Sequence, residues 1–594
     1  MKLPYLLFLL LTINLAYAQT IPQNRLTDWS NPGYRGTGAL NAPIVDVTTL
    51  GIIGDSITDN SSLLNSIIAN AAGNRTVLYF PAGIYLFNNT ITLRDSIVLR
   101  GADAVNTKLR FNFNGSSGNG ISISGRGNST WYPVTDGYQQ GNSWVVVADS
   151  GLITPGDWAE IREQNGTWDT QPISWADNSI GQLIQIISRS GDTLFFDKAL
   201  RISYDAAMQV SISKFTPIKE AGVECLSYER KDSVNCFCPS LSFYHAVDCW
   251  VRGVEGQKSI SAHVLLESSS NISISGCYFH HAFAYDGVSM HGYGLALYYH
   301  TGQCLIENNI FKHLRHSLSF QCGANGNVVS YNYSLDPNRS ETPANYGADI
   351  SMHGHYPYAN LFEGNIVQNI QLDQTWGPNG RRNTFFRNRA ALYGILMTSG
   401  TVNADSQIFA GNEVTSTALF QGNYTLAGAG HYEYGNSIRG VIMPSGTGNL
   451  TDHSLYPTSP PLFWNQGTTW PSLGTPNTAN TGSNPAKDRY ASGINLATCQ
   501  IYSPSTGIEN LINQEELTVF PNPTSGSVQI KLDNSFDYGN YEVADLTGRI
   551  CISGKISNPI YGILNLDLTS LSSGTYFVHI SGKQKLLTAK IILN

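Results

Sequence analysis

The thirteen histidines are distributed unevenly along this chain of 594 residues. An imidazole titrates near neutral pH, so it can take up or release a proton without a large shift of its pKa. We therefore expect acid–base chemistry where histidines gather. Nine of the thirteen lie between residues 263 and 355: His263, His280, His281, His291, His300, His313, His316, His353 and His355.

The candidate catalytic residues come from two loops and the segment between them. Both loops contain the tripeptide Met-His-Gly, at 290–292 and 352–354, and the second continues to another histidine. An adjacent Arg-His pair lies between the loops. Because these residues recur in loops and neighbouring segments rather than singly, we assign catalysis to them: His291, Arg315, His316, His353 and His355.

The surrounding segment is locally cationic. Residues 300–394 contain seven Lys and Arg against six Asp and Glu, whereas the whole chain has a formal net charge of −8. A guanidinium can bind a uronate carboxylate through two parallel hydrogen bonds. We assign the binding of an acidic polysaccharide to Arg381, Arg382, Trp376, Tyr356 and Asp349.

These residue types favour β-elimination. A polysaccharide lyase must neutralise the uronate carboxylate, remove the C5 proton and protonate the leaving oxygen. We expect His316, His353 or His355 to be the base. Arg315, with Arg381 or Arg382, would hold the carboxylate.

Two alternatives remain open. A glycoside hydrolase would need two carboxyl groups facing one glycosidic bond, for which Asp349, Glu363 and Asp373 are the candidates. The chain could also be a non-catalytic, glycan-binding or adhesive surface protein, since exposed repeats rich in tyrosine would suffice for binding. The sequence names neither the sugar nor the mode of cleavage.

No cofactor is required by this chemistry, and we predict no dedicated metal site. His353 and His355 are only two ligands, too few for zinc. Calcium binding through Asp286, Asp349, Glu363 or Asp373 is possible, although no dense run of carboxylates supports it.

The elements that must position these residues repeat along the chain. Seven segments share a polar first position, two mostly apolar residues and a final Asn or Gly, and their ends are spaced by 23, 33, 23, 33, 23 and 24 residues. A unit of this length fits one coil of a parallel β-helix, with Asn or Gly tolerating left-handed backbone at a corner. The two long steps carry the Met-His-Gly loops. The segments are 248–253, 271–276, 304–309, 327–332, 360–365, 383–388 and 407–412.

The N-terminal part of the solenoid has a recognisable pattern. Residues 62–72 carry an apolar stripe at helical spacing, which predicts a capping helix over the open end of the core. The turn 54–59 (Gly-Asp-Ser-Ile-Thr-Asp) and the strand 80–85 (Phe-Pro-Ala-Gly-Ile-Tyr) resemble the first coils of the pectate lyase superfamily. This resemblance implies a right-handed parallel β-helix and, usually, a carbohydrate-active enzyme.

A β-rich insertion is expected at about 130–213, because 142–163 and 191–202 alternate like antiparallel strands. Beyond residue 430, we expect the Pro-rich run 454–464 to lie along the solenoid.

The C-terminal residues 517–594 alternate in short strands separated by turns, which predicts a small Ig-like β-sandwich. The strings 520–524 (Phe-Pro-Asn-Pro-Thr), 545–548 (Asp-Leu-Thr-Gly) and 571–576 (Leu-Ser-Ser-Gly-Thr-Tyr) resemble the C-terminal sorting domain of the type IX secretion system. This implies a Gram-negative, Bacteroidota-type host, with the secretion machinery as partner and delivery to the surface or medium.

The fold class is therefore all-β: a parallel β-helix with a capping helix, an insertion and a C-terminal sandwich. We divide the chain into a signal peptide (1–18), a β-helix domain (19–502), a linker (503–516) and a sorting domain (517–594). No later segment is apolar and long enough to span a membrane. The acidic net charge excludes nucleic acid as a partner, and 41% hydrophobic residues exclude disorder.

Nine cysteines occur in this exported chain, and eight precede the sorting domain. An even number and an oxidising route favour disulfides over zinc, without fixing which cysteines pair.

Overall fold

The computed structural model describes residues 20–36, 42–148, 150–465, 468–474 and 482–499, and in the C-terminal part residues 519–531, 538–545, 550–557, 563–582 and 586–594. The chain divides into two compact units, 1–502 and 503–594. The predicted signal peptide and linker lie outside the described residues. No helix in the described part is long and apolar enough to cross a membrane.

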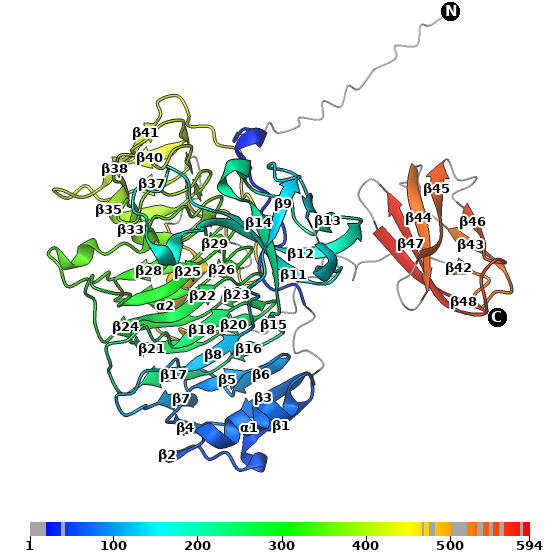
Figure 1. Ribbon diagram of the computed structural model, residues 1–594, viewed down its shortest axis with the longest axis horizontal. Coiled ribbons are helices and arrows are strands. Elements are labelled where there is room, and N and C mark those ends of the chain that lie inside the picture. The colour runs from blue at the N-terminus through cyan, green and yellow to red at the C-terminus, as the bar shows by residue number, and fades with distance from the viewer. Residues whose placement is uncertain are drawn as a thin grey trace, which may run out of the picture. The chain divides into compact units, whose positions relative to one another are not determined.

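The first unit is a parallel β-helix, as predicted (Figure 1). All seven repeated segments contribute strands to one parallel sheet, in which each strand pairs with the strand of the next coil. In spatial order its strands are β1 (Ile44–Asp46), β3 (Thr76–Phe80), β6 (Ile97–Gly101), β16 (Gly222–Glu224), β20 (Trp250–Arg252), β23 (Ser273–Ser275), β26 (Leu305–Glu307), β29 (Val328–Ser330), β32 (Leu361–Glu363), β34 (Thr384–Phe386), β36 (Ile408–Ala410) and β39 (Tyr432–Tyr434).

The left-handed corner residue is the predicted one in the first two coils, Gly253 and Gly276, and lies one residue before the predicted one in the other five. The position directly after each of the seven strands has left-handed backbone, with φ between 53° and 66°. Tyr331 and Arg387 occupy this position as readily as Gly364. In those five coils the asparagine that we predicted at the corner is the residue after it, and it has another role.

That role is a ladder of buried asparagines. Asn365 donates from Nδ2 to the carbonyl of Val329 at 2.8 Å and to Oδ1 of Asn388 at 2.9 Å, while its own Oδ1 accepts from Asn332. The same pattern satisfies the buried polar atoms at the bend of successive coils. The ladder consists of Asn309, Asn332, Asn365, Asn388, Asn412 and Asn436.

The other walls of the solenoid belong to a second, larger sheet, which is parallel except for its last pair of strands. Two strands of each middle coil belong to it. The first Met-His-Gly tripeptide lies in a loop between two such strands, as predicted, whereas the second begins in a strand: Met352 is the last residue of β31, and His353 and Gly354 follow it. Its first coils contain β2 (Asp55–Asp59), β4 (Gly83–Phe87), β5 (Ile91–Leu93), β7 (Thr107–Phe111) and β8 (Ile121–Ser124). One middle series is β17 (Ser227–Arg230), β21 (Glu255–Ser259), β24 (Tyr278–Ala282), β27 (Ile310–Lys312) and β30 (Tyr333–Leu335). The other is β18 (Leu241–Tyr244), β22 (Ala262–Glu267), β25 (Tyr293–Tyr298), β28 (His316–Phe320) and β31 (Ile350–Met352). Both series continue into β33 (Ile366–Leu372), which is followed by β35 (Arg389–Met397), β37 (Glu413–Val414), β38 (Asn423–Thr425), β40 (Asn436–Ile438) and β41 (Val441–Met443).

The capping helix is α1 (Ser61–Ala71), and its buried Leu64 and Ile68 belong to the core of the first coils. It ends one residue earlier than predicted and has Asn60 as its N-cap. Asp59 accepts hydrogen bonds from the backbone and hydroxyl of Ser61, the first residue of the helix.

The insertion is a closed barrel with its own hydrophobic core. Its antiparallel strands are β9 (Tyr132–Asp136), β10 (Trp144–Val147), β11 (Trp158–Glu163), β12 (Ile180–Ser190), β13 (Thr193–Phe196) and β14 (Ser211–Phe215). This confirms the predicted insertion.

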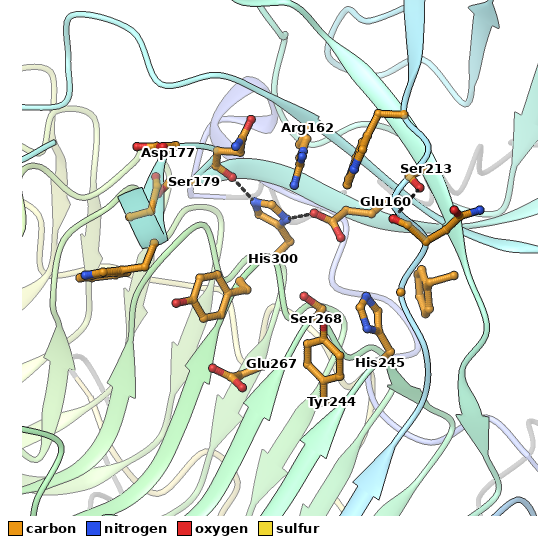
Figure 2. Close-up of a pocket in the computed structure, with 18 of the residues that line it drawn as sticks. Glu160, Arg162, Asp177, Ser179, Ser213, Tyr244, His245, Glu267, Ser268 and His300 are labelled. Atoms are coloured by element: carbon orange, nitrogen blue, oxygen red, sulfur yellow. Dashed lines mark hydrogen bonds and ion pairs between the residues drawn. The ribbon is translucent and has the colours of Figure 1, made fainter. Parts of the chain in front are cut away.

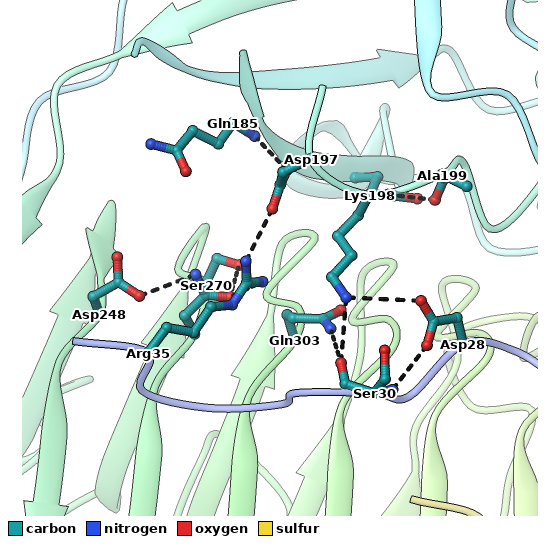
Figure 3. A network of polar contacts seen from close by, with 12 residues as sticks. Asp28, Ser30, Arg35, Gln185, Asp197, Lys198, Ala199, Asp248, Ser270 and Gln303 are labelled. Atoms are coloured by element: carbon teal, nitrogen blue, oxygen red, sulfur yellow. Dashed lines mark hydrogen bonds and ion pairs between the residues drawn. The ribbon is translucent and has the colours of Figure 1, made fainter. Parts of the chain in front are cut away.

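The N-terminal segment fastens the barrel to the solenoid (Figure 3). Arg35 reaches Asp197 of the barrel at 3.1 Å and Asn271 of the solenoid at 2.8 Å. The carbonyl of Ser30 accepts hydrogen bonds from Lys198 and Gln303, both at 3.3 Å. The N-terminal segment therefore bonds with both the barrel and the solenoid and holds the two together.

The end of this unit runs back along the first sheet, as predicted for 454–464. The backbone of Leu455 donates to Glu363 at 2.9 Å, and the hydroxyl of Tyr456 donates to Glu307 at 3.2 Å. Further on, α2 (Pro485–Ser492) precedes Cys499, which forms a disulfide with Cys225.

The disulfide prediction is correct for half of the eight cysteines. The second bond joins Cys236 and Cys238. Four others are buried as free thiols in the solenoid, where they act as small apolar side chains: Cys249, Cys277, Cys304 and Cys322.

The second unit consists of two antiparallel sheets around a shared apolar core, which confirms the predicted sandwich. One sheet contains β42 (Val519–Phe520), β43 (Ser527–Lys531) and β46 (Ile563–Asp567). The other contains β45 (Ile550–Ser557), β44 (Tyr538–Asp545), β47 (Gly574–Gly582) and β48 (Leu586–Leu593).

Candidate functional site

One row of side chains crosses five strands on the outer surface of the second sheet. Leu297, Phe320, Met352 and Leu372 are paired in successive strands and buried in the core. Because side chains alternate across a strand, the residues that follow them face outward. Glu267, paired with Tyr298, begins the same row. We call Glu267, Tyr298, Gln321, His353 and Asp373 the outer row.

His353 and Asp373 are adjacent in this row and hydrogen-bonded. Nδ1 of His353 lies 2.7 Å from Oδ2 of Asp373. Burial alone would raise the pKa of Asp373, but the His353 imidazole and the hydrogen bonds from Thr375 outweigh it and lower that pKa. Because a carboxylate only accepts, Nδ1 is the donor in this bond, and in the neutral ring the lone pair is therefore on Nε2. The pair therefore has the arrangement of a general base held by a carboxylate.

His316 is the buried neighbour of this pair. Its ring centroid lies 5.8 Å from that of His353 and 4.8 Å from that of Tyr293. Nδ1 donates to the carbonyl of Ala348 at 3.1 Å, and Nε2 is buried without a partner in the described part of the chain. Burial and the nearby Arg315 hold the pKa of His316 well below its usual value, so the ring is neutral.

Arg315 is held at the edge of this cluster by the first Met-His-Gly loop. One of its terminal nitrogens donates to the carbonyl of Asp286 at 2.7 Å, and its guanidinium lies 5.7 Å from the ring centroid of Tyr293. The side chain of Asp286 contacts Nδ1 of His291 at 2.9 Å. His291 is therefore part of the loop that positions Arg315.

A cavity of about 430 Å³ lies at the other end of the outer row, between barrel and solenoid (Figure 2). We call it the barrel cavity. Its volume is in the range of ligand pockets, about 300–1,000 Å³. The barrel side contributes Trp131, Glu160, Arg162 and Trp175, and the solenoid contributes Tyr244, His245, Glu267, Tyr299 and His300.

Glu267 is a carboxyl group on the solenoid wall of the barrel cavity. No hydrogen bond or ion pair of its side chain occurs within the described residues, and burial raises its pKa to about 7. Glu160, on the opposite wall, lies 2.8 Å from Nδ1 of His300. Burial would raise the pKa of Glu160, but His300 and Arg162 outweigh it and lower that pKa. The two carboxyl groups therefore favour opposite protonation states.

Trp175 lines the barrel cavity and also contacts two of the predicted site residues, His355 and Trp376. Its ring lies 5.1 Å from that of His355 and 5.3 Å from that of Trp376. His355 is fully buried and donates from Nε2 to the carbonyl of Gln171 at 3.1 Å. A base at this position could not reach a substrate, so His355 packs the barrel against the solenoid instead. Tyr356 also packs the solenoid against the barrel, because its ring centroid lies 4.8 Å from that of Trp168.

The remaining predicted residues lie elsewhere. Asp349 is 1% exposed, and its carboxylate accepts hydrogen bonds from Ser334 and from the backbone of Gln368 and Asn369. It holds the coil together and cannot reach a substrate. Arg381 is exposed and Arg382 half-buried in the turn before β34, and no described contact joins either to Arg315.

Sequence reasoning missed Glu267, Tyr298 and the charged residues of the barrel wall. Glu267 ends the apolar run 264–266 just as Tyr298 ends 295–297. Aligning these runs would have placed both residues in one row. Glu160 and Arg162 had no such signal, because only the folded barrel brings them to the solenoid.

The candidate calcium ligands do not gather. Asp286, Asp349, Glu363 and Asp373 each contact different protein groups. The described residues contain no group of three or more His, Cys, Asp or Glu side chains that could hold a metal ion.

Comparison with protein families identifies both ends of the chain. Residues 44–149 match the family model "Rhamnogalacturonase A/epimerase, pectate lyase-like". Residues 518–594 match "Secretion system C-terminal sorting domain". A curated relative, the non-secreted LysM effector LysM19 of Penicillium expansum, is 29% identical over 70 residues, which are 12% of this chain and 5% of that protein.

Similar solved structures share little sequence with this chain. The tailspike protein gp49 of Pseudomonas phage LKA1 is 14% identical, with 62% of each chain covered and a TM-score of 0.43. The A-module of mannuronan C-5 epimerase AlgE6 from Azotobacter vinelandii is 12% identical, with 66% of this chain and 98% of that chain covered and a TM-score of 0.32. The surface adhesin PfbA of Streptococcus pneumoniae is 11% identical, with coverages of 63% and 86% and a TM-score of 0.32.

The chain thus combines a pectate-lyase-like parallel β-helix with a type IX sorting domain. It is secreted or displayed on the surface of a Bacteroidota-type bacterium, as the sequence predicted.

Proposed function

We propose that this protein cleaves an acidic polysaccharide by β-elimination. The observation that supports this best is the pair formed by His353 and Asp373 on the outer face of the solenoid. Nε2 of His353 removes the C5 proton of a uronate residue, and the electrons left behind form the C4–C5 double bond. The bond from C4 to the leaving oxygen breaks, and the imidazolium returns the proton to that oxygen.

Arg315 is the residue that we propose for the uronate carboxylate. Arg315 and His353 both lower the pKa of His316, whose ring centroid lies 5.8 Å from that of His353. A guanidinium beside the carboxylate stabilises the negative charge that develops when C5 loses its proton. These side chains supply the charges that the reaction needs, so we expect activity to survive treatment with EDTA.

The test is a screen of uronic-acid polysaccharides with the full-length protein. Elimination leaves an unsaturated sugar that absorbs in the ultraviolet, and the H353A variant should lose this product. The matched control is H313A, because Nδ1 of His313 contacts Asp336 at 2.8 Å outside the outer row. Products that lack the ultraviolet chromophore would contradict elimination, and full activity of H353A would contradict the assignment of the base.

Hydrolysis is the second candidate, and Glu267 is the observation that favours it. A half-buried carboxyl group with a pKa of about 7 is protonated often enough at neutral pH to act as a general acid. Glu160 would be the second carboxyl group. Incorporation of oxygen from labelled water at the new reducing end, abolished by E267Q, would identify this reaction.

A further inference from the structure

The barrel cavity differs from the surface around His353, because three carboxyl groups line it: Glu160, Asp177 and Glu267. Glu160 lies beside both His300 and Arg162, and Arg162 also stacks on Trp131 with its guanidinium 3.4 Å from the ring centroid. Lys214 is 3.6 Å from Asp157. A negatively charged ligand would therefore face these three acidic side chains.

The polar atoms that remain available suit hydroxyl groups. Nε of Arg162 and Nδ1 of His245 are buried without a hydrogen-bond partner in the described part of the chain. His245 is only 5% exposed. The carboxyl group of Glu267 also has no protein partner there and can donate or accept. Unpaired buried polar groups cost free energy, which a ligand bearing several hydroxyls would recover.

Aromatic side chains supply the apolar part of the same cavity. Trp175 is 39% exposed and Tyr244 is 40% exposed, although each is large and apolar enough to be buried. Tyr299 lines the cavity beside them. The apolar face of a sugar ring can stack on such aromatic surfaces while its hydroxyls meet the polar wall.

We infer that the barrel cavity binds a neutral sugar residue of the polysaccharide. The inference rests on the proposed function and narrows its substrate to a heteropolysaccharide with both neutral and acidic residues. Glu267 and His353 belong to the same row, three strands apart, so their Cα atoms are separated by about 14 Å at the usual strand spacing. A chain lying across the strands would therefore place different residues at the two positions.

The experiment measures binding of monosaccharides to the full-length protein by saturation-transfer NMR. Monosaccharides contain no glycosidic bond to cleave, so the result does not depend on catalysis. The probes are two matched pairs, galactose with galacturonate and glucose with glucuronate. We expect the neutral member of a pair to bind more tightly, and W175A to weaken its binding about tenfold.

The control variant is W144A, because Trp144 is half-buried on β10 of the same barrel but does not line the cavity. Unfolding curves of both variants establish that the barrel is intact. Tighter binding of the acidic sugars, equal loss in W144A and W175A, or no saturation transfer to either neutral sugar would overturn the inference. Because the ultraviolet assay of H353A measures cleavage separately, failure of one proposal leaves the other standing.

Discussion

Asp373 binds Nδ1 of His353 at 2.7 Å from the neighbouring strand, so the ring is held by a residue twenty positions later in the chain. This relationship depends on the register between β31 and β33, in which Met352 pairs with Leu372. Each member of the pair is the residue that follows a buried partner of that register. The solenoid therefore positions the imidazole through its regular strand pairing.

D373N should reduce the rate of cleavage by about 100-fold or more, because general acid–base catalysis contributes about 10²–10⁴-fold. An amide still fills the space but no longer favours the protonated imidazole. We expect kcat to fall while KM changes little. The control is D336N, which alters the similar pair with His313. Equal effects of the two substitutions would contradict the role of Asp373.

The substitution E267Q should make the free energy of unfolding less dependent on pH between about 4.5 and 7. Burial raises the pKa of Glu267 to about 7 from its usual 4.5, so the folded state holds this proton more tightly than the unfolded chain does. The contribution of Glu267 to the free energy of unfolding therefore falls as pH rises from 4.5 to about 7, by at most about 3 kcal/mol. Denaturant titrations of both proteins across this range measure it. An unchanged pH dependence in E267Q would refute the raised pKa.

N365A should destabilise the β-helix by about 3 kcal/mol, because it leaves several buried polar groups without partners. The side chain of Asn365 bonds with Val329 and Asn332 of the preceding coil and with Asn388 of the following one. N89A is the control, since Asn89 is exposed. Equal midpoints of denaturation for the two variants would show that the ladder is not stabilising.

C225S should release the C-terminal end of the first unit, because the Cys225–Cys499 bond ties residues 274 positions apart. A bond of this kind stabilises a fold by about 2–4 kcal/mol. Limited proteolysis should cut the variant around α2 before the solenoid is degraded. C236S, which removes the short disulfide with Cys238, is the comparison. Cleavage at the same rate in both variants would contradict this view.

Deletion of residues 517–594 should trap the protein in the periplasm of its native host, because the sorting domain addresses the chain across the outer membrane. Conversely, fusion of 517–594 to a periplasmic reporter should export the reporter. Fractionation followed by immunoblotting detects both. Normal delivery of the truncated chain would disprove the role of this domain.

The sequence by itself determined the architecture, because each coil repeats the same short-range pattern. Apolar residues at alternating positions, and turn residues at steps of 23 or 33, specify strands and bends locally. The pattern even located the asparagines of the ladder, although it did not separate them from the left-handed residue that precedes each one. The sorting domain was equally clear, since its strands and turns are contiguous in the chain.

The chemistry of the site was decided by tertiary structure. His353 and His355 are two residues apart, yet one faces outward beside Asp373 and the other is buried beneath the barrel. The buried carboxylate of Asp349 accepts hydrogen bonds from the backbone of Gln368 and Asn369 in β33. Glu267 and Glu160 line one cavity from positions 107 residues apart, because the barrel that contains Glu160 docks on the solenoid. Burial, register and the docking of the barrel set which groups are exposed and which are protonated, and none of these is a local property of the sequence.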